Sequence, residues 1–214
     1  MSVDLPLSRY LLSPTDFSQQ LRLGRCERYL RLRMVEREHG RGFLTEAGAY
    51  PQEPSALLSE DGDDFEGEIV SALRETRTVL PGIDAARAAL KPGQSALIFQ
   101  PRLEAKLGRW NVRGDADIIE LSCDAQGALS AHIIDIKSSE EARVEHRLQV
   151  AFYAALLEAA YNIPAPRLSI LHRGDPIEDW PAMLAPVTDP AAYRAEVDAL
   201  VQGDHALADR LAEA

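Results

Sequence analysis

The spacing of apolar residues along the chain predicts helices first and strands afterwards. Residues 13–16 (SPTD) combine the cap, the proline and the acid typical of a helix start, and the helical pattern then continues to about residue 38. Residues 39–64 are rich in Gly, Pro and acids and predict an irregular loop. Two further helices are expected over 64–79 and 83–90.

From residue 95 onward the pattern changes to that of β-strands. Gly108 and the turn at 124–127 predict antiparallel hairpins between consecutive strands. The mixed order of helices and strands predicts an α/β protein with one central mixed sheet flanked by helices. The predicted strands cover 95–106, 109–122, 129–137 and 167–172; helices are predicted over 139–161 and near the carboxyl end, around Tyr193 to Val201.

Two predicted strands carry the charged residues that indicate chemistry. Alternate residues of a strand share a face, so Asp135 and Lys137 are expected to point the same way, as are Asp115 and Asp117. Hard cations such as Mg²⁺ prefer carboxylate oxygens, and phosphodiester hydrolysis needs a metal and a cation nearby. We therefore expect Asp117 and Asp135 to bind the metal, with Lys137 offsetting their repulsion and assisting the attacking water. An edge strand with one solvated face is the alternative.

Polar residues beside this cluster leave two interpretations each. Gly114 predicts a bend or the close approach of another backbone. Gln149 and Tyr153, four residues apart on the predicted helix, either tie it to the sheet or contact substrate phosphate and orient Lys137. Glu66 falls on the apolar face of its helix, at about 100° per residue. It is therefore expected to form a buried salt bridge or to lie near the metal.

The net charge of −11 looks unfavourable for a nucleic-acid enzyme until the acids are located. Residues 51–68 hold seven acids and no base, and residues 175–214 hold nine acids against two arginines. The rest of the chain has 18 acids and 21 bases, a net charge of +3. Six of these bases are arginines between residues 22 and 37, which predict either a solvated helix face or a phosphate-binding wall.

The amino terminus has no signal pattern and no apolar run is long enough to span a membrane, so a cytoplasmic protein without membrane association is expected. Two cysteines, Cys26 and Cys123, are too few for a disulfide framework or a four-thiolate site.

The runs VRGDADIIE, HIIDIKSS and QVAFY resemble the RecB-type branch of the PD-(D/E)XK nuclease superfamily. That branch carries Gly-x-x-Asp, carboxylate-x-Lys and Gln-x-x-x-Tyr motifs in this order. The resemblance covers about residues 8–175 and implies a restriction-endonuclease-like core and DNA cleavage that depends on Mg²⁺ or Mn²⁺. It implies catalytic roles for five residues: Asp117, Asp135, Lys137, Gln149 and Tyr153.

Two departures from the branch change the expected ligands. Many members place a metal-binding histidine on the helix before the sheet, where this chain reads GDDFEGEIV, so Glu66 is the best substitute as a metal ligand beside Asp117 and Asp135. Related CRISPR-associated exonucleases hold an iron–sulfur cluster through four cysteines, of which this chain matches at most Cys26. No cluster is therefore expected.

These patterns together predict a nuclease domain over residues 1–175 and an acidic helical extension over 176–214, which could lead into further segments. The expected activity is exonucleolytic cleavage of DNA ends or single strands. The alternatives are a non-catalytic nuclease-fold module that binds DNA or a partner protein, and a domain that serves a larger helicase or repair assembly.

Overall fold

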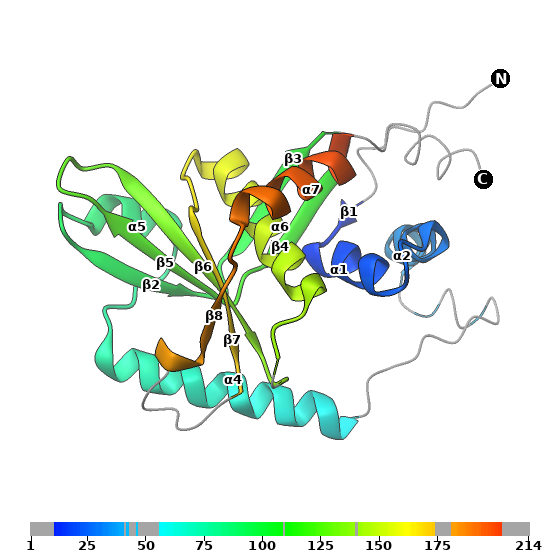
Figure 1. Cartoon of the computed structure of the whole chain (residues 1–214), viewed down its shortest axis with the longest axis horizontal. Coiled ribbons are helices and arrows are strands. Elements are labelled where there is room, and N and C mark those ends of the chain that lie inside the picture. The colour runs from blue at the N-terminus through cyan, green and yellow to red at the C-terminus, as the bar shows by residue number, and fades with distance from the viewer. Residues whose placement is uncertain are drawn as a thin grey trace.

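The computed structural model describes residues 11–40, 42, 46, 56–108, 110–139, 141–173 and 181–202. Within these ranges six helices flank two mixed β-sheets (Figure 1). This arrangement confirms the predicted α/β class and is consistent with a restriction-endonuclease-like core. Beside the predicted central mixed sheet, which has five strands, a second sheet of three strands is present.

The larger sheet has the order β2-β5-β6-β7-β8, and only its β6–β7 pair is parallel. The smaller sheet has the order β1-β4-β3, with β1 parallel to β4. The predicted hairpins at Gly108 and at 124–127 are both present, between β3 and β4 and between β5 and β6. The strands are β1 (Leu11–Leu12), β2 (Ser95–Phe99), β3 (Arg102–Leu107), β4 (Trp110–Asp115), β5 (Ile118–Cys123), β6 (Leu129–Lys137), β7 (Arg167–His172) and β8 (Leu184–Pro186).

The two sheets arise because one long hairpin changes direction halfway. The predicted strands 95–106 and 109–122 break at Gln100–Pro101 and at Ala116–Asp117. Pro101 has no amide hydrogen for a ladder, and Gln100 has a φ of 48°. Two hydrogen bonds hold the hairpin together across the break: Gln100 N donates to Asp117 O at 2.9 Å, and Ala116 N donates to Pro101 O at 3.2 Å.

The first predicted helix is two helices. Helix α1 (Pro14–Arg22) begins as expected, with Ser13 as its cap and Pro14 in its first turn. It then ends, and α2 (Glu27–His39) begins in a new direction (Figure 1). The prediction of one continuous helix is wrong because Gly24 and Arg25 adopt left-handed backbone conformations, with φ values of 68° and 62°.

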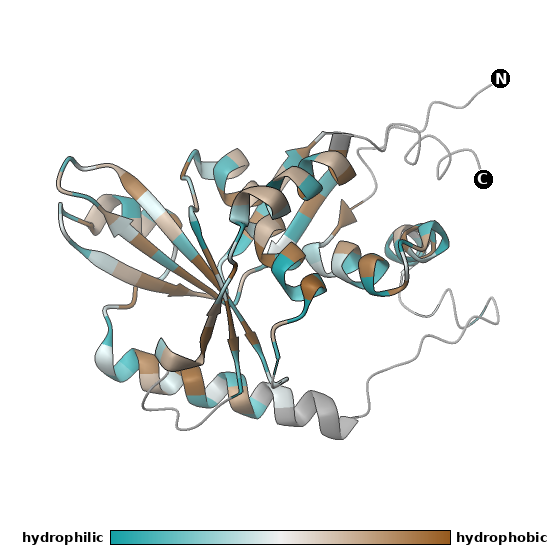
Figure 2. Ribbon diagram, in the orientation of Figure 1, coloured by the Kyte–Doolittle hydropathy of each residue, from teal (hydrophilic) through white to brown (hydrophobic). Residues whose placement is uncertain are grey.

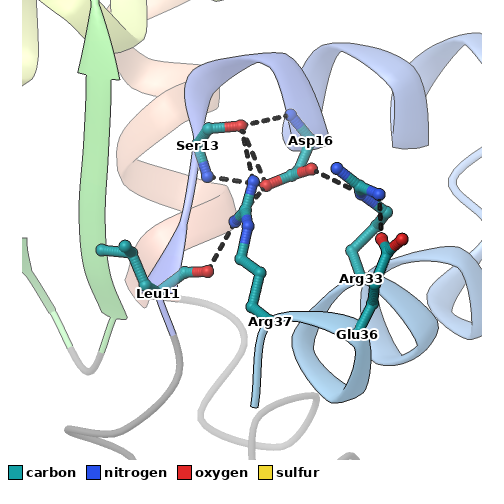
Figure 3. A network of polar contacts seen from close by, with 6 residues as sticks. All are labelled: Leu11, Ser13, Asp16, Arg33, Glu36 and Arg37. Atoms are coloured by element: carbon teal, nitrogen blue, oxygen red, sulfur yellow. Dashed lines mark hydrogen bonds and ion pairs between the residues drawn. The ribbon is translucent and has the colours of Figure 1, made fainter. Parts of the chain in front are cut away.

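A buried carboxylate fixes the angle between α1 and α2 (Figure 3). Asp16 is 2% exposed, and its oxygens lie 3.2 Å from Arg33 Nε and 2.6 Å from an Arg37 nitrogen. Asp16 also accepts hydrogen bonds from the backbone and the hydroxyl of Ser13. Two of the six arginines predicted to form a basic face or a phosphate-binding wall therefore serve helix packing instead. A third, Arg25, pairs with Glu196 at 2.5 Å.

The other helices cover the two faces of the larger sheet. Helix α4 packs Phe65, Ile69 and Leu73 against one face, toward which the strands are apolar (Figure 2). Helix α6 packs against the opposite face. The helices are α4 (Ala56–Thr76), α5 (Ile83–Ala89), α6 (Val144–Tyr161) and α7 (Pro190–Gln202). The predicted loop over 39–64 is wrong from residue 56 onward, where α4 already runs, and most of its earlier part lies outside the described residues.

The described part of the carboxyl-terminal segment packs onto this core. Val197 and Val201 of α7 are buried in the same cluster as α6 and β4. Gly108 adopts a φ of 57° beneath Val201, where a Cβ atom would lie 2.8 Å from that residue's side chain and carbonyl oxygen. In the part of the chain that the structure describes, no helix has the length and apolar character needed to cross a membrane.

Glu120 of β5 is partly buried and contacts residues from three other segments. It pairs with Arg77, which follows α4, and it lies 3.4 Å from Arg167 Nη2 of β7. It also faces His132 of β6, whose other ring nitrogen lies 2.8 Å from the hydroxyl of the buried Ser169. The imidazole of His132, 3.7 Å away, and the charges of the two arginines lower the pKa of Glu120 from 4.5 to about 2. Ionised Glu120 therefore stabilises the fold.

Replacing Glu120 with glutamine is expected to make folding less stable and less sensitive to acid. Because the folded pKa lies below the unfolded one, the stabilisation is complete above pH 4.5 and disappears as the pH falls toward about 2. Urea unfolding should show that Glu120→Gln lowers the free energy of unfolding by about 1–3 kcal/mol at neutral pH. Between about pH 5 and pH 3 the free energy of unfolding should fall less steeply in this variant than in the wild type. Glu104→Gln, on the exposed side of β3, is the control. Parallel pH profiles for wild type and Glu120→Gln would contradict this role.

Candidate active site at the junction of the two sheets

Strand register brings the two predicted metal-binding aspartates together. Ile118 is the partner of Ile134 in the antiparallel β5–β6 ladder, so Asp117 and Asp135 stand opposite each other at the next position. Their carboxyl groups lie close enough for each to shift the pKa of the other. The break at Ala116 places this pair where the larger sheet meets the smaller one.

Asp135 is fully buried and is held from two sides. Its Oδ1 accepts a hydrogen bond from Gln149 Nε2 of α6 at 3.2 Å. Its Oδ2 forms an ion pair with Lys137 Nζ at 2.7 Å and accepts no hydrogen bond from another of the described residues. A buried carboxylate oxygen in that condition has an unused capacity to bind a proton or a cation.

Asp117 is partly buried and has an unusual acidity. Its Oδ2 accepts a hydrogen bond from the backbone N–H of Ile136 at 2.6 Å. Burial and then the negative charge of Asp135 raise the pKa of Asp117 to about 7, against the opposing effects of Lys137 and of the Ile136 amide. Burial likewise raises the pKa of Asp135. The pair therefore holds its negative charge at a cost that a bound cation would relieve.

Lys137 supplies one positive charge to the pair. Burial acts to lower the pKa of Lys137, but the charges of Asp135 and Asp117 outweigh this effect and raise it. The side chain is 26% exposed, so the ammonium group both contacts Asp135 and reaches the surface of the site. An ammonium at this position stays protonated across the physiological pH range and can meet a phosphate.

Gln149 and Tyr153 lie on the face of α6 that packs toward the aspartates. Both residues are buried, at 7% and 3% exposure. Gln149 ties α6 to β6 through Asp135, which is the structural alternative drawn from the sequence. Burial and the charges of Asp135 and Asp117 raise the pKa of the Tyr153 phenol, so the hydroxyl stays protonated as a hydrogen-bond donor.

Gly114 is explained by the side chains that press against it. A Cβ atom on Gly114 would lie 2.8 Å from Pro14 Cδ and 2.9 Å from Tyr153 Cε1. The close approach at this glycine is therefore made by two side chains, those of Pro14 and Tyr153, and not by another backbone as predicted. The absence of a side chain at Gly114 allows Tyr153 to sit beside the aspartates.

Replacing Gly114 with alanine is expected to displace Tyr153 or Pro14 and to destabilise the fold by about 1–3 kcal/mol, the usual cost of overpacking. Thermal unfolding measures this loss. The matched control is Gly67→Ala on the exposed face of α4, where a Cβ atom meets nothing within 4 Å. That change should stabilise the helix by about 0.5–1 kcal/mol. Equal melting temperatures for wild type and Gly114→Ala would contradict the packing role.

Asp115 does not share the environment of Asp117. The expectation that both point the same way assumed an unbroken strand, and the strand ends between them. Asp115 is exposed and accepts two hydrogen bonds from its cross-strand neighbour Arg102, at 2.9 and 3.1 Å.

Glu66 lies near the site but is engaged with another residue. It is partly buried at the edge of the apolar face of α4, and its Oε1 accepts a hydrogen bond from Gln100 Nε2 at 2.8 Å. Its charge contributes to the raised pKa values of Asp135 and Lys137. Among the described residues no three His, Cys, Asp or Glu side chains form a group that could hold a metal ion. The three-carboxylate set therefore stays a prediction.

Two features of the site were missed in the sequence. Gln100 connects Glu66 to the backbone of Asp117, and the Ile136 amide holds the Asp117 carboxylate. Pro101 within a predicted strand was the signal that could have revealed the bend at Gln100, whereas a backbone donor leaves no trace in the side-chain pattern.

The donors present fit a hard divalent cation. Two opposed carboxylates supply oxygen ligands, one of these oxygens is buried and accepts no hydrogen bond from a described residue other than Lys137, and their negative charge is only partly offset by that ammonium. Mg²⁺ and Mn²⁺ prefer such oxygen ligands.

Comparison with known proteins identifies the family of the chain. The family model described as "PD-(D/E)XK nuclease superfamily" matches residues 19–213. No curated protein matches the chain significantly. Twelve chains of known structure match it. One of them, titled "Crystal structure of SSO0001", is 18% identical, with a TM-score of 0.43 over 90% of this chain and 76% of that chain.

Proposed function

Because the chain belongs to the PD-(D/E)XK nuclease superfamily, whose members are generally metal-dependent nucleases, we propose that it is a deoxyribonuclease that uses Mg²⁺ or Mn²⁺. The observation that carries this proposal is the opposition of Asp117 and Asp135, with Lys137 Nζ 2.7 Å from the latter. We propose further that it acts as an exonuclease on DNA ends or single strands.

In the proposed mechanism Asp117 and Asp135 hold the cation, with Glu66 as a third carboxylate linked to Asp117 through Gln100. A bound divalent cation would lower the pKa of a water molecule and offset the negative charge of the phosphate. Ile136 N–H and Gln149 fix the orientation of the two aspartates through their hydrogen bonds. Oriented ligands matter because a displaced carboxylate changes both the charge and the geometry of the site.

Lys137 has two tasks in this proposal. Before substrate binds, its ammonium offsets the repulsion between the aspartates. When the phosphodiester is attacked, negative charge grows on the non-bridging oxygens, and the partly exposed ammonium stabilises it. The phenol of Tyr153, kept protonated by its surroundings, can donate a hydrogen bond to the phosphate.

The order of the three motifs supports placing the chain in the RecB-type branch. On that basis we propose residues 1–175 as the catalytic unit, residues 176–214 as an extension and a helicase or repair protein as the partner. Val197 and Val201 pack on the core, which supports a fold shared by the catalytic unit and the described part of the extension.

Cleavage of internally labelled DNA tests the proposal. Single-stranded, duplex and covalently closed circular single-stranded DNA are incubated with Mn²⁺, with Mg²⁺ or with EDTA. We expect metal-dependent release of short products from the linear substrates, with the circle resistant because it has no end. Cleavage of the circle would contradict exonuclease action, and no cleavage of any DNA with either metal would contradict the nuclease itself. A matched linear RNA tests the preference for DNA.

Calorimetric titration with Mn²⁺ separates the nuclease from a non-catalytic module that only binds DNA or a partner. The nuclease should take up Mn²⁺ with an affinity that rises through about pH 7, because Asp117 must lose its proton to bind the ion. Asp117→Asn should abolish this uptake. A module without catalysis would show no heat that depends on Asp117.

A further inference from the structure

A groove lined by three arginines runs along the β2 edge of the larger sheet, beside the candidate active site. It consists of two adjoining hollows that share Pro81 and Phe99. The charged side chains that line them are three arginines and one acid: Arg74, Arg77, Arg102 and Asp84. Arg77 pairs with Glu120 and Arg102 pairs with the exposed Asp115, whereas Arg74 lies over the ring of Phe99.

The groove begins one strand away from Asp117. Phe99 and Gln100 line it, and they pair with Ile118 and Asp117 across the β2–β5 hairpin. The side chain of Gln100 also donates a hydrogen bond to Glu66, so this end of the groove adjoins the candidate active site.

An aromatic ring and a guanidinium group form the floor of this groove. The Arg74 guanidinium carbon lies 5.4 Å from the centroid of the Phe99 ring. Phe99 is only partly buried, yet it packs against the apolar cluster of α4 and the sheet, so its ring is held in place. Nucleobases stack on aromatic rings and on guanidinium planes whatever their sequence, provided that the base is unpaired.

Arg102 is placed to meet the phosphates of such a strand. Its side chain is 65% exposed and that of its partner Asp115 is 47% exposed. Exposed ion pairs of this kind contribute little to stability, so a phosphate can replace Asp115 as the partner at small cost. Arginine binds phosphate through two parallel hydrogen bonds.

We propose that this groove binds an unpaired DNA strand, with a base stacked at Arg74 and Phe99 and a phosphate at Arg102, and leads it to Asp117 and Asp135. This inference deepens the proposed nuclease function and rests on it for the direction in which the strand runs. Duplex DNA does not fit the same role, because its base faces are already stacked.

Binding measured without cleavage tests the groove. The affinity of a short fluorescein-labelled oligothymidine is determined by fluorescence anisotropy in EDTA. Phe99→Leu, which keeps an apolar side chain against the cluster, and Arg74→Gln should each weaken binding about tenfold. Arg74→Gln should also reduce the dependence of log Kd on log salt by about 0.7. Arg28→Gln, which removes an exposed arginine from α2, should leave the affinity unchanged.

Each contrary result has a defined meaning. Equal affinity of wild type, Phe99→Leu and Arg74→Gln for oligothymidine would overturn the proposed binding site. The same conclusion would follow if duplex DNA bound as tightly as oligothymidine and if the two substitutions weakened its binding equally. Tight binding of an oligoglutamate peptide, lost in Arg74→Gln but kept in Phe99→Leu, would identify a protein partner and overturn the DNA assignment. Arg74 is exposed, so its variant keeps the test decisive even if Phe99→Leu fails to fold.

The two proposals fail separately. Loss of oligothymidine binding in the groove variants, with no cleavage of DNA by wild type in Mn²⁺, would support the groove and contradict the nuclease. If the wild type cleaves DNA in a metal-dependent way and neither groove substitution changes the affinity for oligothymidine, only the proposed binding site in the groove is contradicted.

Discussion

Replacing Lys137 with alanine is expected to lower the rate of DNA cleavage by about 10²–10³, the usual effect of removing one charge-stabilising donor from an active site. The ammonium lies 2.7 Å from Asp135 Oδ2 and reaches the surface of the site. Its removal takes away the positive charge that meets the developing negative charge of the phosphate. It also leaves Asp117 and Asp135 to repel each other, so apo protein should bind protons more tightly at this pair.

The measurement is the single-turnover rate on labelled single-stranded DNA at saturating Mn²⁺. Lys106→Ala, which removes an exposed lysine from β3, is the matched control and should keep the wild-type rate. Wild-type cleavage by Lys137→Ala would remove Lys137 from the mechanism. Metal binding by the same variant, followed by calorimetry, tells loss of chemistry from loss of the metal.

Asp117→Asn is expected to stop cleavage while making the metal-free protein more stable. Asparagine keeps an oxygen to accept the Ile136 hydrogen bond but removes a charge that burial and Asp135 oppose. The folded pKa of Asp117, about 7, lies above its ordinary value of 3.8. The wild type is therefore most stable below pH 3.8 with respect to this group and loses stability as the pH rises through about 7.

The gain in the free energy of unfolding should reach up to about 4 kcal/mol above neutral pH and vanish in acid. Urea unfolding in EDTA at several pH values measures it. Asp115→Asn, two residues away and exposed, is the control and should change neither stability nor cleavage strongly. Mn²⁺ should stabilise the wild type and not Asp117→Asn, because only the wild type retains both ligands. Lower stability of Asp117→Asn at pH 8 or above would contradict the strained pair.

These two expectations describe one property of the molecule. A pair of carboxylates at the end of a buried strand lowers stability, and only partial compensation comes from Lys137 and the Ile136 amide. Groups retained against their effect on stability are commonly those that function requires.

The sequence alone was enough to predict which charged residues meet at the candidate site. Asp117, Asp135 and Lys137 stand out because charged side chains interrupt strongly apolar strands, and such interruptions can be read without knowing what surrounds them. The start of α1, the two hairpins, α5, β6 and β7 also follow from local signals, since caps, turns and periodicity depend on residues close in the chain.

Only the tertiary structure decided how distant segments meet. It divided the long hairpin at Gln100 and Ala116, separating Asp115 from Asp117, and it turned Arg33 and Arg37 toward Asp16. It also showed that Gly114 makes room for Pro14 and Tyr153. These contacts depend on how helices and sheets pack in space, and side-chain periodicity along one segment carries no record of the neighbour that the segment will meet.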